Sequence, residues 1–524
     1  MLKLLGLLGV STTAVAFGYR QDLTPGAPQR FAQDSLNDHP FEPQISLPSR
    51  SVREENGHSG SDRWLSDPRA PLTSSDRVRQ IQGYASATSI GQGDVIDFHV
   101  SARSSRTFRI SIFRLGHYGG KGARLRLTSP VLQVRDHRTP DADPDTGSIA
   151  CEWPASWSLR IPFGWMSGLY QAVFTADDGF RAATPFVVKE AERASDLLVV
   201  LPFTTYQASN MWPKDRRNGK SLYRGYRADG TIGGADGRAY EVSFDRPYSG
   251  AGIPSWFHLD TSFIDWAERS GLDVTYASSL DLHDGTVDTT RYRAVFFPGH
   301  DAYWSADMLD SARKSVAAGT HLAFLTSHNV YFHVRLKPAP SRRTERTAGT
   351  AGTRPTARTM ACYKSKADPA PDRAGRTSRW REVEPGQRRA EQGLLGIQFN
   401  GIVAKPVPLV VKESGHWLWA GSGVRDGDEL PGLVGVEADR LDPTAPTPVG
   451  SRLTLLAESP YHDPRPVTVP AVQHTAITEY RNGALVFVAG TFHWPLALTA
   501  PEHLNEKIQK ATGNLVARMV REQP

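Results

Sequence analysis

The chain has 524 residues and a formal net charge of +6, from 61 Lys and Arg against 55 Asp and Glu. One hydrophobic core rarely serves more than about 250–300 residues, so this length predicts two or three domains. Hydrophobic residues make up 39% of the chain, which excludes a wholly disordered protein. No run approaches the ~20 apolar residues of a membrane-spanning helix, and two cysteines cannot build a disulfide framework or a cysteine-rich zinc site.

The positive charge is confined to one segment. Residues 338–389 hold 13 Lys and Arg against 5 acidic residues, a net of +8, which leaves 48 basic and 50 acidic residues elsewhere. A nucleic-acid-binding protein would also carry a basic face on its folded domains, so nucleic acid is not an expected partner. The segment is rich in Pro, Gly, Thr and Ala, and we predict a flexible, solvated insertion, with a polyanion-binding arm as the alternative.

The N-terminus has the pattern of an export signal. Lys3 precedes the apolar run 4–10, and Ala14-Val-Ala16 has the small-x-small form that signal peptidase accepts. We therefore predict a signal peptide in residues 1–18 and a secreted or cell-envelope protein. An uncleaved lipid-facing anchor and a chance pattern in a cytoplasmic protein are the alternatives. The polar residues 19–77, rich in Pro, Ser and Asp, are predicted to be a linker.

Short alternating apolar stretches follow in residues 78–190. Residues 94–100, 107–114 and 168–174 each place apolar side chains on one face with a period of two. Several such strands within about 110 residues are typical of an antiparallel β-sandwich. Cys151, beside Trp153, is expected to be packed in its core.

The pattern changes again in residues 195–524. The continuous apolar run 196–201 is typical of a strand covered on both faces. Strands alternating with helices predict a Rossmann-like α/β domain with a parallel sheet. Asn482-Gly483 predicts a two-residue hairpin between strands 475–480 and 484–489. The remaining expected elements are helices 261–270, 306–317 and 502–520 and strands 273–277, 294–297 and 321–325.

Common catalytic motifs are absent from the sequence. It contains no H-E-x-x-H, P-loop, G-x-S-x-G or G-x-G-x-x-G after a strand. Neither Cys151 nor Cys362 stands at a strand-to-helix turn, so a cysteine nucleophile of the glutamine-amidotransferase kind has no candidate.

Polar and aromatic side chains gather instead after two predicted strands. Ligands of open α/β sheets bind beyond the carboxyl ends of the strands, where both loops are expected to lie. A purely structural role is equally consistent with this spacing: Ser305 or Asp307 would cap the next helix, and the tyrosines would be half-buried packing. The eight polar groups are His300, Asp301, Tyr303, His328, Asn329, Tyr331, His333 and Arg335.

A set of short segments in a fixed order resembles the large (beta) subunit of N,N-dimethylformamidase and its bacterial relatives. The similarity covers about four-fifths of the chain, including the sandwich. The segments include Phe113-Arg-Leu-Gly-His-Tyr-Gly-Gly120, Thr205-Tyr-Gln-Ala-Ser-Asn-Met-Trp212, Ser221-Leu-Tyr223, Val242-Ser-Phe-Asp-Arg-Pro-Tyr248, Gly299-His-Asp-Ala-Tyr-Trp-Ser305, Asn329-Val-Tyr331, Cys362-Tyr-Lys-Ser365 and Gly432-Leu-Val-Gly-Val-Glu-Ala-Asp439.

The resemblance implies a glutamine-amidotransferase-like α/β domain and an amidohydrolase with one ferric iron held by two tyrosines and a glutamate. Matching the motifs assigns these ligands to Tyr303, Tyr331 and Glu437. Phenolate and carboxylate are hard oxygen donors that suit ferric iron. We expect the catalytic residues His300, Asp301, His328 and Asn329 to orient groups or carry protons around the metal.

The implied function is hydrolysis of the C–N bond of a small amide, with further copies of the chain or a small subunit as partners. One departure from the family pattern supports an alternative. Where many relatives have Glu after His-Asp, this chain has Ala302. A non-catalytic exported binding protein with a degenerate α/β domain is therefore the second hypothesis.

Overall fold

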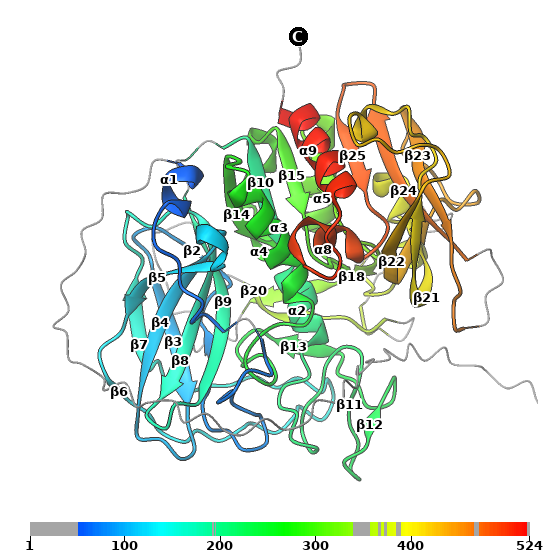
Figure 1. Ribbon diagram of the computed structural model, residues 1–524. Coiled ribbons are helices and arrows are strands. Elements are labelled where there is room, and N and C mark those ends of the chain that lie inside the picture. The colour runs from blue at the N-terminus through cyan, green and yellow to red at the C-terminus, as the bar shows by residue number, and fades with distance from the viewer. Residues whose placement is uncertain are drawn as a thin grey trace, which may run out of the picture.

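The computed structural model describes residues 51–65, 67–190, 193, 195–338, 357–364, 368–370, 375–383, 389–465 and 471–520. The predicted signal peptide and residues 19–50 of the predicted linker lie outside this range. The fold is mixed α/β, with antiparallel sheets beside a mixed, mostly parallel sheet that carries helices (Figure 1). Within the described ranges, no helix combines the length and apolarity needed to cross a membrane.

Two sheets pack face to face in the N-terminal part, as the alternating pattern predicted. Phe98 contacts Phe174 and Phe186 of the opposite sheet edge-on, with ring centroids 6.3 and 5.7 Å away. One sheet has the order β1 (Gln82–Ala85), β3 (Val95–Ser101), β7 (Trp157–Arg160). The other has the order β2 (Ser89–Gly91), β9 (Arg181–Lys189), β8 (Gly168–Ala176), β4 (Thr107–Leu115), β5 (Ala123–Thr128), with β6 (Leu132–Gln133) also on β4.

The central sheet of the C-terminal part has seven strands, of which the first five are mutually parallel. Their continuous apolar sequences are fully buried because helices cover both faces. The predicted parallel sheet is therefore confirmed and gains an antiparallel edge. Its order is β14 (Val274–Ser278), β10 (Leu197–Leu201), β15 (Ala294–Phe297), β17 (His321–Phe324), β25 (Leu485–Val488), β24 (Val472–Tyr480), β23 (Ser451–Pro460).

Two groups of helices form the outer layers (Figure 1). Helices α3 (Phe257–Arg269), α8 (His493–Thr499) and α9 (Glu506–Val520) share one core with the sheet. The other face packs on α4 (Ser279–Asp284), α5 (Ala306–Ala317) and α7 (Gln392–Leu395). Ser305 caps α5 by accepting a hydrogen bond from the Met308 amide, as the structural alternative for this loop predicted.

The hairpin between β24 and β25 differs from its prediction by one residue. The amide of Tyr480 donates to the carbonyl of Ala484, which leaves three residues in the loop instead of two. Gly483 adopts a φ of 84° there, the left-handed conformation that three-residue hairpin loops use.

Several elements had no clear sequence pattern. The most important is a long hairpin formed by β21 (Gln398–Val410) and β22 (Glu429–Arg440), which lies beside β23 and β24. The others are α1 (Val52–Asn56), α2 (Phe203–Ser209), β11 (Gly225–Tyr226), β12 (Ile232–Gly233), β13 (Glu241–Ser243), β16 (Tyr303–Trp304), β18 (Phe332–His333), β19 (Arg335–Pro338), β20 (Ala357–Ala361) and α6 (Trp380–Val383).

Parts of the predicted linker and of the predicted flexible insertion are packed. In the linker, the buried carboxylate of Glu55 accepts hydrogen bonds from Arg124 and Arg126 of β5. In the insertion, β20 pairs with β13 and β19, and Arg358 forms a buried ion pair with Asp245. These described parts contradict a solvated linker and a solvated insertion, because Glu55 and Arg358 are paired with opposite charges elsewhere in the chain. The rest of the insertion lies outside the described residues.

A buried ion pair joins the two halves of the molecule. The guanidinium of Arg114 in β4 donates to both carboxylate oxygens of Glu268 in α3, at 2.7 and 2.8 Å, and both side chains are completely buried. Tyr276 and Asn56 donate to the same carboxylate. Because every acceptor position is used, the burial of both charges is compensated.

We expect Arg114→Leu to lower the free energy of unfolding by about 3–5 kcal/mol, because it leaves the charge of Glu268 buried and unpaired. Adding Glu268→Leu should recover part of the loss. Chemical denaturation measures both, with Arg452→Leu as the control, since its pair with Glu479 is exposed. A loss for Arg114→Leu as small as that of the control would contradict this role.

Candidate functional site

The chain reverses its direction across the sheet between β10 and β15. From β10 it moves outward to β14 and then crosses back to β15 on the other side. Ligands of such sheets bind at this switch point, beyond the carboxyl ends of the strands. The loop with His300 and Asp301 follows β15, and the loop with His328 and Asn329 follows β17, so both predicted clusters lie at this edge.

The two loops lie side by side. Tyr303 and Trp304 form the short strand β16, which pairs in parallel with β18 in the other loop. The carbonyl of Ala302 accepts hydrogen bonds from the amides of Tyr331 and Phe332. Thr205, in α2 beyond β10, accepts from the amides of Ala302 and Tyr303. Backbone pairing therefore sets the distance between the clusters.

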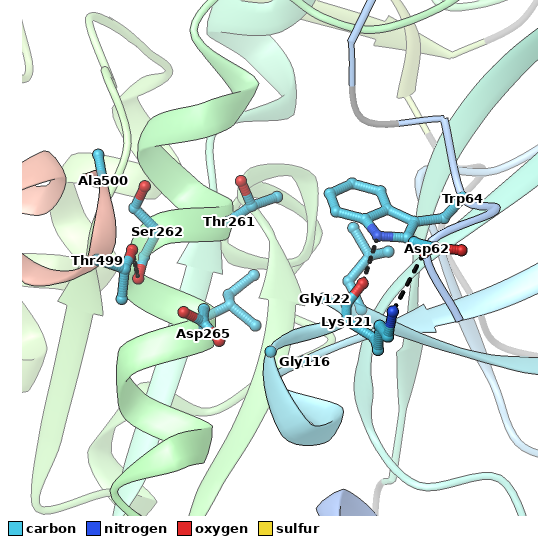
Figure 2. Close-up of a pocket in the computed structure, with 13 residues that line it drawn as sticks. Asp62, Trp64, Gly116, Lys121, Gly122, Thr261, Ser262, Asp265, Thr499 and Ala500 are labelled. Atoms are coloured by element: carbon cyan, nitrogen blue, oxygen red, sulfur yellow. Dashed lines mark hydrogen bonds and ion pairs between the residues drawn. The ribbon is translucent and has the colours of Figure 1, made fainter. Parts of the chain in front are cut away.

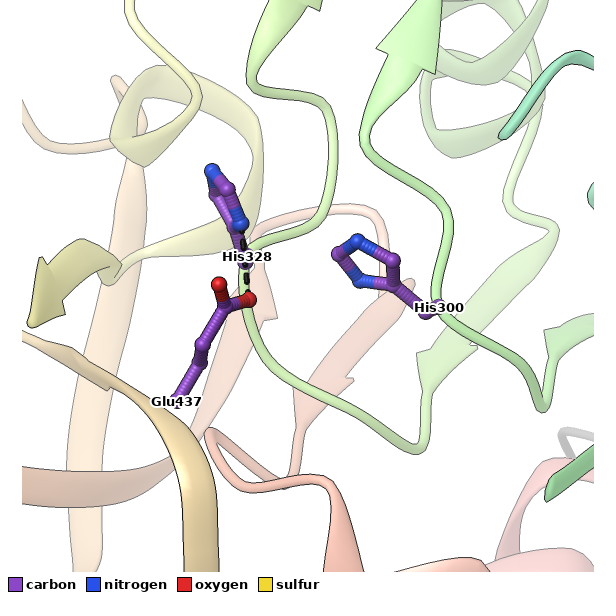
Figure 3. Close-up of side chains that lie close together, drawn as sticks. All are labelled: His300, His328 and Glu437. Carbon is purple, nitrogen blue, oxygen red and sulfur yellow. Dashed lines mark hydrogen bonds and ion pairs between the residues drawn. The ribbon is translucent and has the colours of Figure 1, made fainter. Parts of the chain in front are cut away.

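A group of three side chains able to hold a metal ion lies where these loops meet β22. His300, His328 and Glu437 each offer one ligand atom, and these atoms lie within 4.8 Å of one another. Figure 3 shows the two imidazoles on neighbouring loops with the carboxylate next to the His328 ring, and Nδ1 of His328 is 2.8 Å from Glu437 Oε2. The side chain of Glu437 is 21% exposed, which leaves one side of the group open to solvent.

Hydrogen bonds hold β22 over the strand ends and thereby place Glu437. The Ser327 hydroxyl donates to the carbonyl of Glu437 at 2.7 Å, and the amide of His328 donates to the carboxylate of Asp439 at 2.8 Å. Beyond β25, Thr491 accepts from the amide of Gly435 and donates to the carbonyl of Leu433. The long hairpin is thus attached to two of the parallel strands at their carboxyl ends.

Strained backbone conformations gather at this site. Among the described residues, nine non-glycine residues have positive φ, and four of these lie around the three ligands. They are His328 (φ 60°), Val330 (φ 51°), Lys364 (φ 52°) and Val436 (φ 68°). A β-branched residue in this region is a true outlier, and such strain persists mainly where function requires it.

Val436 provides a test of this strain. We expect Val436→Gly to change the free energy of unfolding by less than about 1 kcal/mol, because relief of the backbone offsets the lost side chain. Val434→Gly, in the same strand at a fully buried position without positive φ, should lose about 3 kcal/mol. Equal losses in urea denaturation would show that Val436 is not strained.

The electrostatics of the three side chains favour a cation. Burial lowers the pKa of His300 to about 4, so its imidazole is neutral and its lone pair is free at neutral pH. For Glu437, burial alone would raise the pKa, but His328, followed by His300 and Arg465, outweighs burial and lowers it overall. Two imidazoles and an ionised carboxylate are ligands of metal ions in many proteins.

Buried carboxyl groups surround the three ligands. Burial raises the pKa of Asp301 to about 7 and that of Asp439 to about 8. Asp260, from α3, is fully buried below the β15 loop, and burial raises its pKa to about 8. Gly299 leaves the space for it, since a Cβ there would lie 2.3 Å from the Asp260 carboxylate.

We expect Asp260 to make the protein less stable as pH rises. Its folded pKa lies above the ordinary value of 3.8, so the folded state holds more protons between about pH 4 and pH 8. The free energy of unfolding therefore falls across this window. In denaturation curves, Asp260→Asn should make this fall shallower between pH 5 and pH 9 by the share due to Asp260, while Asp301 and Asp439 keep theirs. The exposed Asp145→Asn should follow the wild type. Parallel profiles for Asp260→Asn and the wild type would contradict the assignment.

Several buried polar atoms at this site have no hydrogen-bond partner within the described part of the chain. Buried polar groups are nearly always bonded, so a concentration of exceptions marks a place where a further atom is expected. The atoms are Nδ1 of His300, Nε2 of His328, the hydroxyl of Tyr303, and one carboxylate oxygen each of Asp260, Asp301 and Asp439.

The two predicted tyrosine ligands occupy different surroundings. Tyr331 contacts His328 edge-on, with ring centroids 4.2 Å apart. Tyr303 is fully buried against Tyr223 and Phe332, at 5.8 and 5.0 Å between centroids, and burial raises its pKa well above 10. Their role as metal ligands stays a prediction.

Three other predicted polar groups are engaged elsewhere. The amide of Asn329 is bonded within its own loop to Thr326. Nδ1 of His333 donates to the carbonyl of Arg376, and Arg335 forms an ion pair with Asp368. The last two hold parts of the basic insertion in place, whereas Asn329 shapes the loop that carries His328.

The sequence interpretation missed Asp260, Asp439 and Lys364 as members of the site. Asp439 ends the Val434–Asp439 family segment, which was a usable signal. Asp260 lies on an ordinary helix face, and Lys364 lies in the segment interpreted as solvated. No local pattern distinguishes either of them.

A cavity of about 370 Å³ lies elsewhere, between the sandwich and α3 (Figure 2). Its polar side chains are paired with one another: Lys121 with Asp62 at 3.3 Å, and the Trp64 indole with the carbonyl of Lys121 at 3.0 Å. Thr499 donates to the carbonyl of Ser262. Since its polar groups are paired in this way, this cavity is a weaker candidate than the group around Glu437.

Two of the solved structures that match the chain are distant likenesses. One is the sulfur carrier protein SoxY from Chlorobium limicola f thiosulfatophilum, with 18% identity over 21% of this chain and 78% of that chain, and a TM-score of 0.13. Another is a cycloisomaltooligosaccharide glucanotransferase of Paenibacillus sp., with 9% identity over 46% of this chain and 44% of that chain, and a TM-score of 0.17. At these TM-scores neither carries an argument.

No curated protein matches the sequence. A family model described as N,N-dimethylformamidase beta subunit-like, C-terminal, matches residues 109–509, which span most of the sandwich, both loops, the insertion and the long hairpin. This confirms the resemblance drawn from the short segments. The chain belongs to the N,N-dimethylformamidase beta subunit-like family.

Proposed function

We propose that this protein is a metal-dependent hydrolase of the C–N bond of small amides, with the metal bound by His300, His328 and Glu437. The observation that carries the proposal is the convergence of these three ligand atoms within 4.8 Å of one another at the switch point of the sheet. Family membership supports the amide as the substrate, because the family is named after an amidase. The glutamine-amidotransferase-like fold and the export expected from the sequence are part of the same proposal.

The donor set fits a divalent ion. Ligand atoms bound to zinc lie about 2.0–2.2 Å from it, so a bound ion would draw the three side chains slightly together. The unpartnered Nδ1 of His300 and Nε2 of His328 are available for a metal or its water. Ferric iron, which the resemblance implies, would instead favour the oxygen donors Tyr303 and Tyr331 with Glu437. Glu437 belongs to both sets.

A metal ion with an open position polarises a carbonyl and lowers the pKa of bound water. The surrounding residues of the chain would transfer protons and orient the metal ligands. Asp301, with a pKa near 7 due to burial, can take up or release a proton near neutral pH, and Thr205 holds its carboxyl group at 3.4 Å. Asp439 fixes the backbone of His328, and Phe399 stacks on its ring at 4.0 Å, which fixes the orientation of the imidazole.

Metal titration tests the proposal. We expect the chelator-treated protein to take up about one Zn²⁺ or Fe²⁺ per chain, measured by elemental analysis, and then to hydrolyse small amides such as N,N-dimethylformamide. His300→Ala, His328→Ala and Glu437→Gln should each weaken metal binding about a hundredfold or more, since even residues behind the ligands cost ten- to a hundredfold.

The controls separate the two donor sets. The half-buried His58, which is not one of the three ligands, is the control, and His58→Ala should bind metal like the wild type. Tyr303→Phe and Tyr331→Phe should also retain metal if the histidines are ligands. Loss of metal and of a visible phenolate-to-iron absorption in the tyrosine variants, with metal retained in His300→Ala, would instead establish the ferric site. A protein that binds no metal would support the non-catalytic binding protein, the alternative suggested by Ala302.

A further inference from the structure

Lys364 lies in a cage of aromatic rings beside the proposed metal site. Its Nζ is 3.7 Å from the ring centroid of Tyr223, 4.4 Å from that of Phe332 and 5.1 Å from that of Tyr303. The cage is adjacent to the metal site because Phe332 lies 6.3 Å from the His328 ring, centroid to centroid. Tyr303 belongs to the same loop as His300.

The ammonium group has no counter-charge within the described part of the chain. No hydrogen bond or ion pair joins Nζ to any described residue, and only the backbone amide of Lys364 is bonded, to the carbonyl of Thr377. Ring faces attract a cation but accept no conventional hydrogen bond, so no described residue accepts from the three N–H donors of Nζ. Burial lowers the pKa of Lys364 to about 7, as expected for an ammonium that leaves water without gaining a carboxylate.

A second cation lies at the same place. Arg238 donates from Nη2 to the carbonyl of Tyr363, the residue before Lys364. Its Nη1 is buried and has no hydrogen-bond partner among the described residues. Other cations nearby are paired: Arg381 with Glu391 and Arg379 with Glu382. Among the described residues, two cations with donors that nothing accepts from therefore lie close enough for the charge of Arg238 to act on both Lys364 and Tyr303.

The backbone of Lys364 supports a specific role. Its φ of 52° is unfavourable for a residue with a Cβ, and such strain is retained where a side chain must point in one direction. Tyr223 and Arg238 are half-buried, so the cage is reachable from solvent.

We propose that Lys364 and Arg238 form an anion subsite that binds a carboxylate of the substrate, which makes the substrate class small amides with a carboxylate, such as N-acyl amino acids. Hydrolysis of such a substrate rests on the proposed function, whereas binding of its carboxylate does not depend on the metal site. The carboxylate would accept hydrogen bonds from the unused donors of both cations, while the amide group reaches the metal site on the other side of Phe332. Charge-assisted hydrogen bonds of this kind are about twice as strong as neutral ones.

Binding of two matched probes tests the subsite without any turnover. N-Acetylglycine carries the carboxylate, and N-acetylglycinamide is its neutral analogue. In calorimetric titrations of the full chain with EDTA present, we expect N-acetylglycine to bind the wild type about tenfold or more tightly than the neutral analogue. Lys364→Gln should remove this preference, Arg238→Gln should weaken it, and Lys364→Arg should retain most of it. Lys510→Gln, an exposed change on α9, is the matched control.

Equal binding of both probes to the wild type would overturn the proposal. So would the absence of binding of either probe at concentrations up to about 10 mM. A preference that survives in Lys364→Gln would overturn it as well. If Lys364→Gln does not fold, the wild-type comparison and Lys364→Arg still decide. His328→Ala separates this proposal from the proposed function: it should abolish hydrolysis and keep the preference for N-acetylglycine.

Discussion

The five parallel strands of the central sheet end at one edge, and the organisation of the site depends on this constraint. Strands β10, β15 and β17 run side by side in parallel, so the loops that follow them must meet. Backbone hydrogen bonds from Ala302 to the opposite loop fix their separation. His300 and His328 are neighbours for this reason, although they are 28 positions apart in the sequence.

The third ligand reaches the edge by a different route. Glu437 belongs to an antiparallel hairpin outside the main sheet, held over the strand ends by Ser327, Asp439 and Thr491. Left-handed backbone at Val436 and His328 is the local consequence of this attachment. The strain and the buried carboxylates destabilise the edge, whereas compensated pairs such as Arg114 with Glu268 stabilise the molecule elsewhere.

Much of the fold could be predicted from local sequence patterns. Helix α5 and strand β15 have the predicted bounds, and β10 and β17 differ by one residue, because continuous apolar runs and a serine cap are local signals. Residues 51–77 and the described parts of the insertion were misjudged. Their compositions are polar, and only the distant acids and bases that pair with them, such as Asp245 with Arg358, show that they are packed.

The sequence by itself determined the family, the sandwich followed by a parallel α/β sheet, and the two polar loops at neighbouring strand ends. Periodicity, turn residues and short ordered segments carry that information locally. Only the tertiary structure decided that Glu437 joins His300 and His328, and that Lys364 lies in an aromatic cage instead of in solvent. Those contacts join residues far apart in the chain, 109 positions for His328 and Glu437, and depend on how the long hairpin and the insertion pack. No local pattern of side chains encodes such a distance.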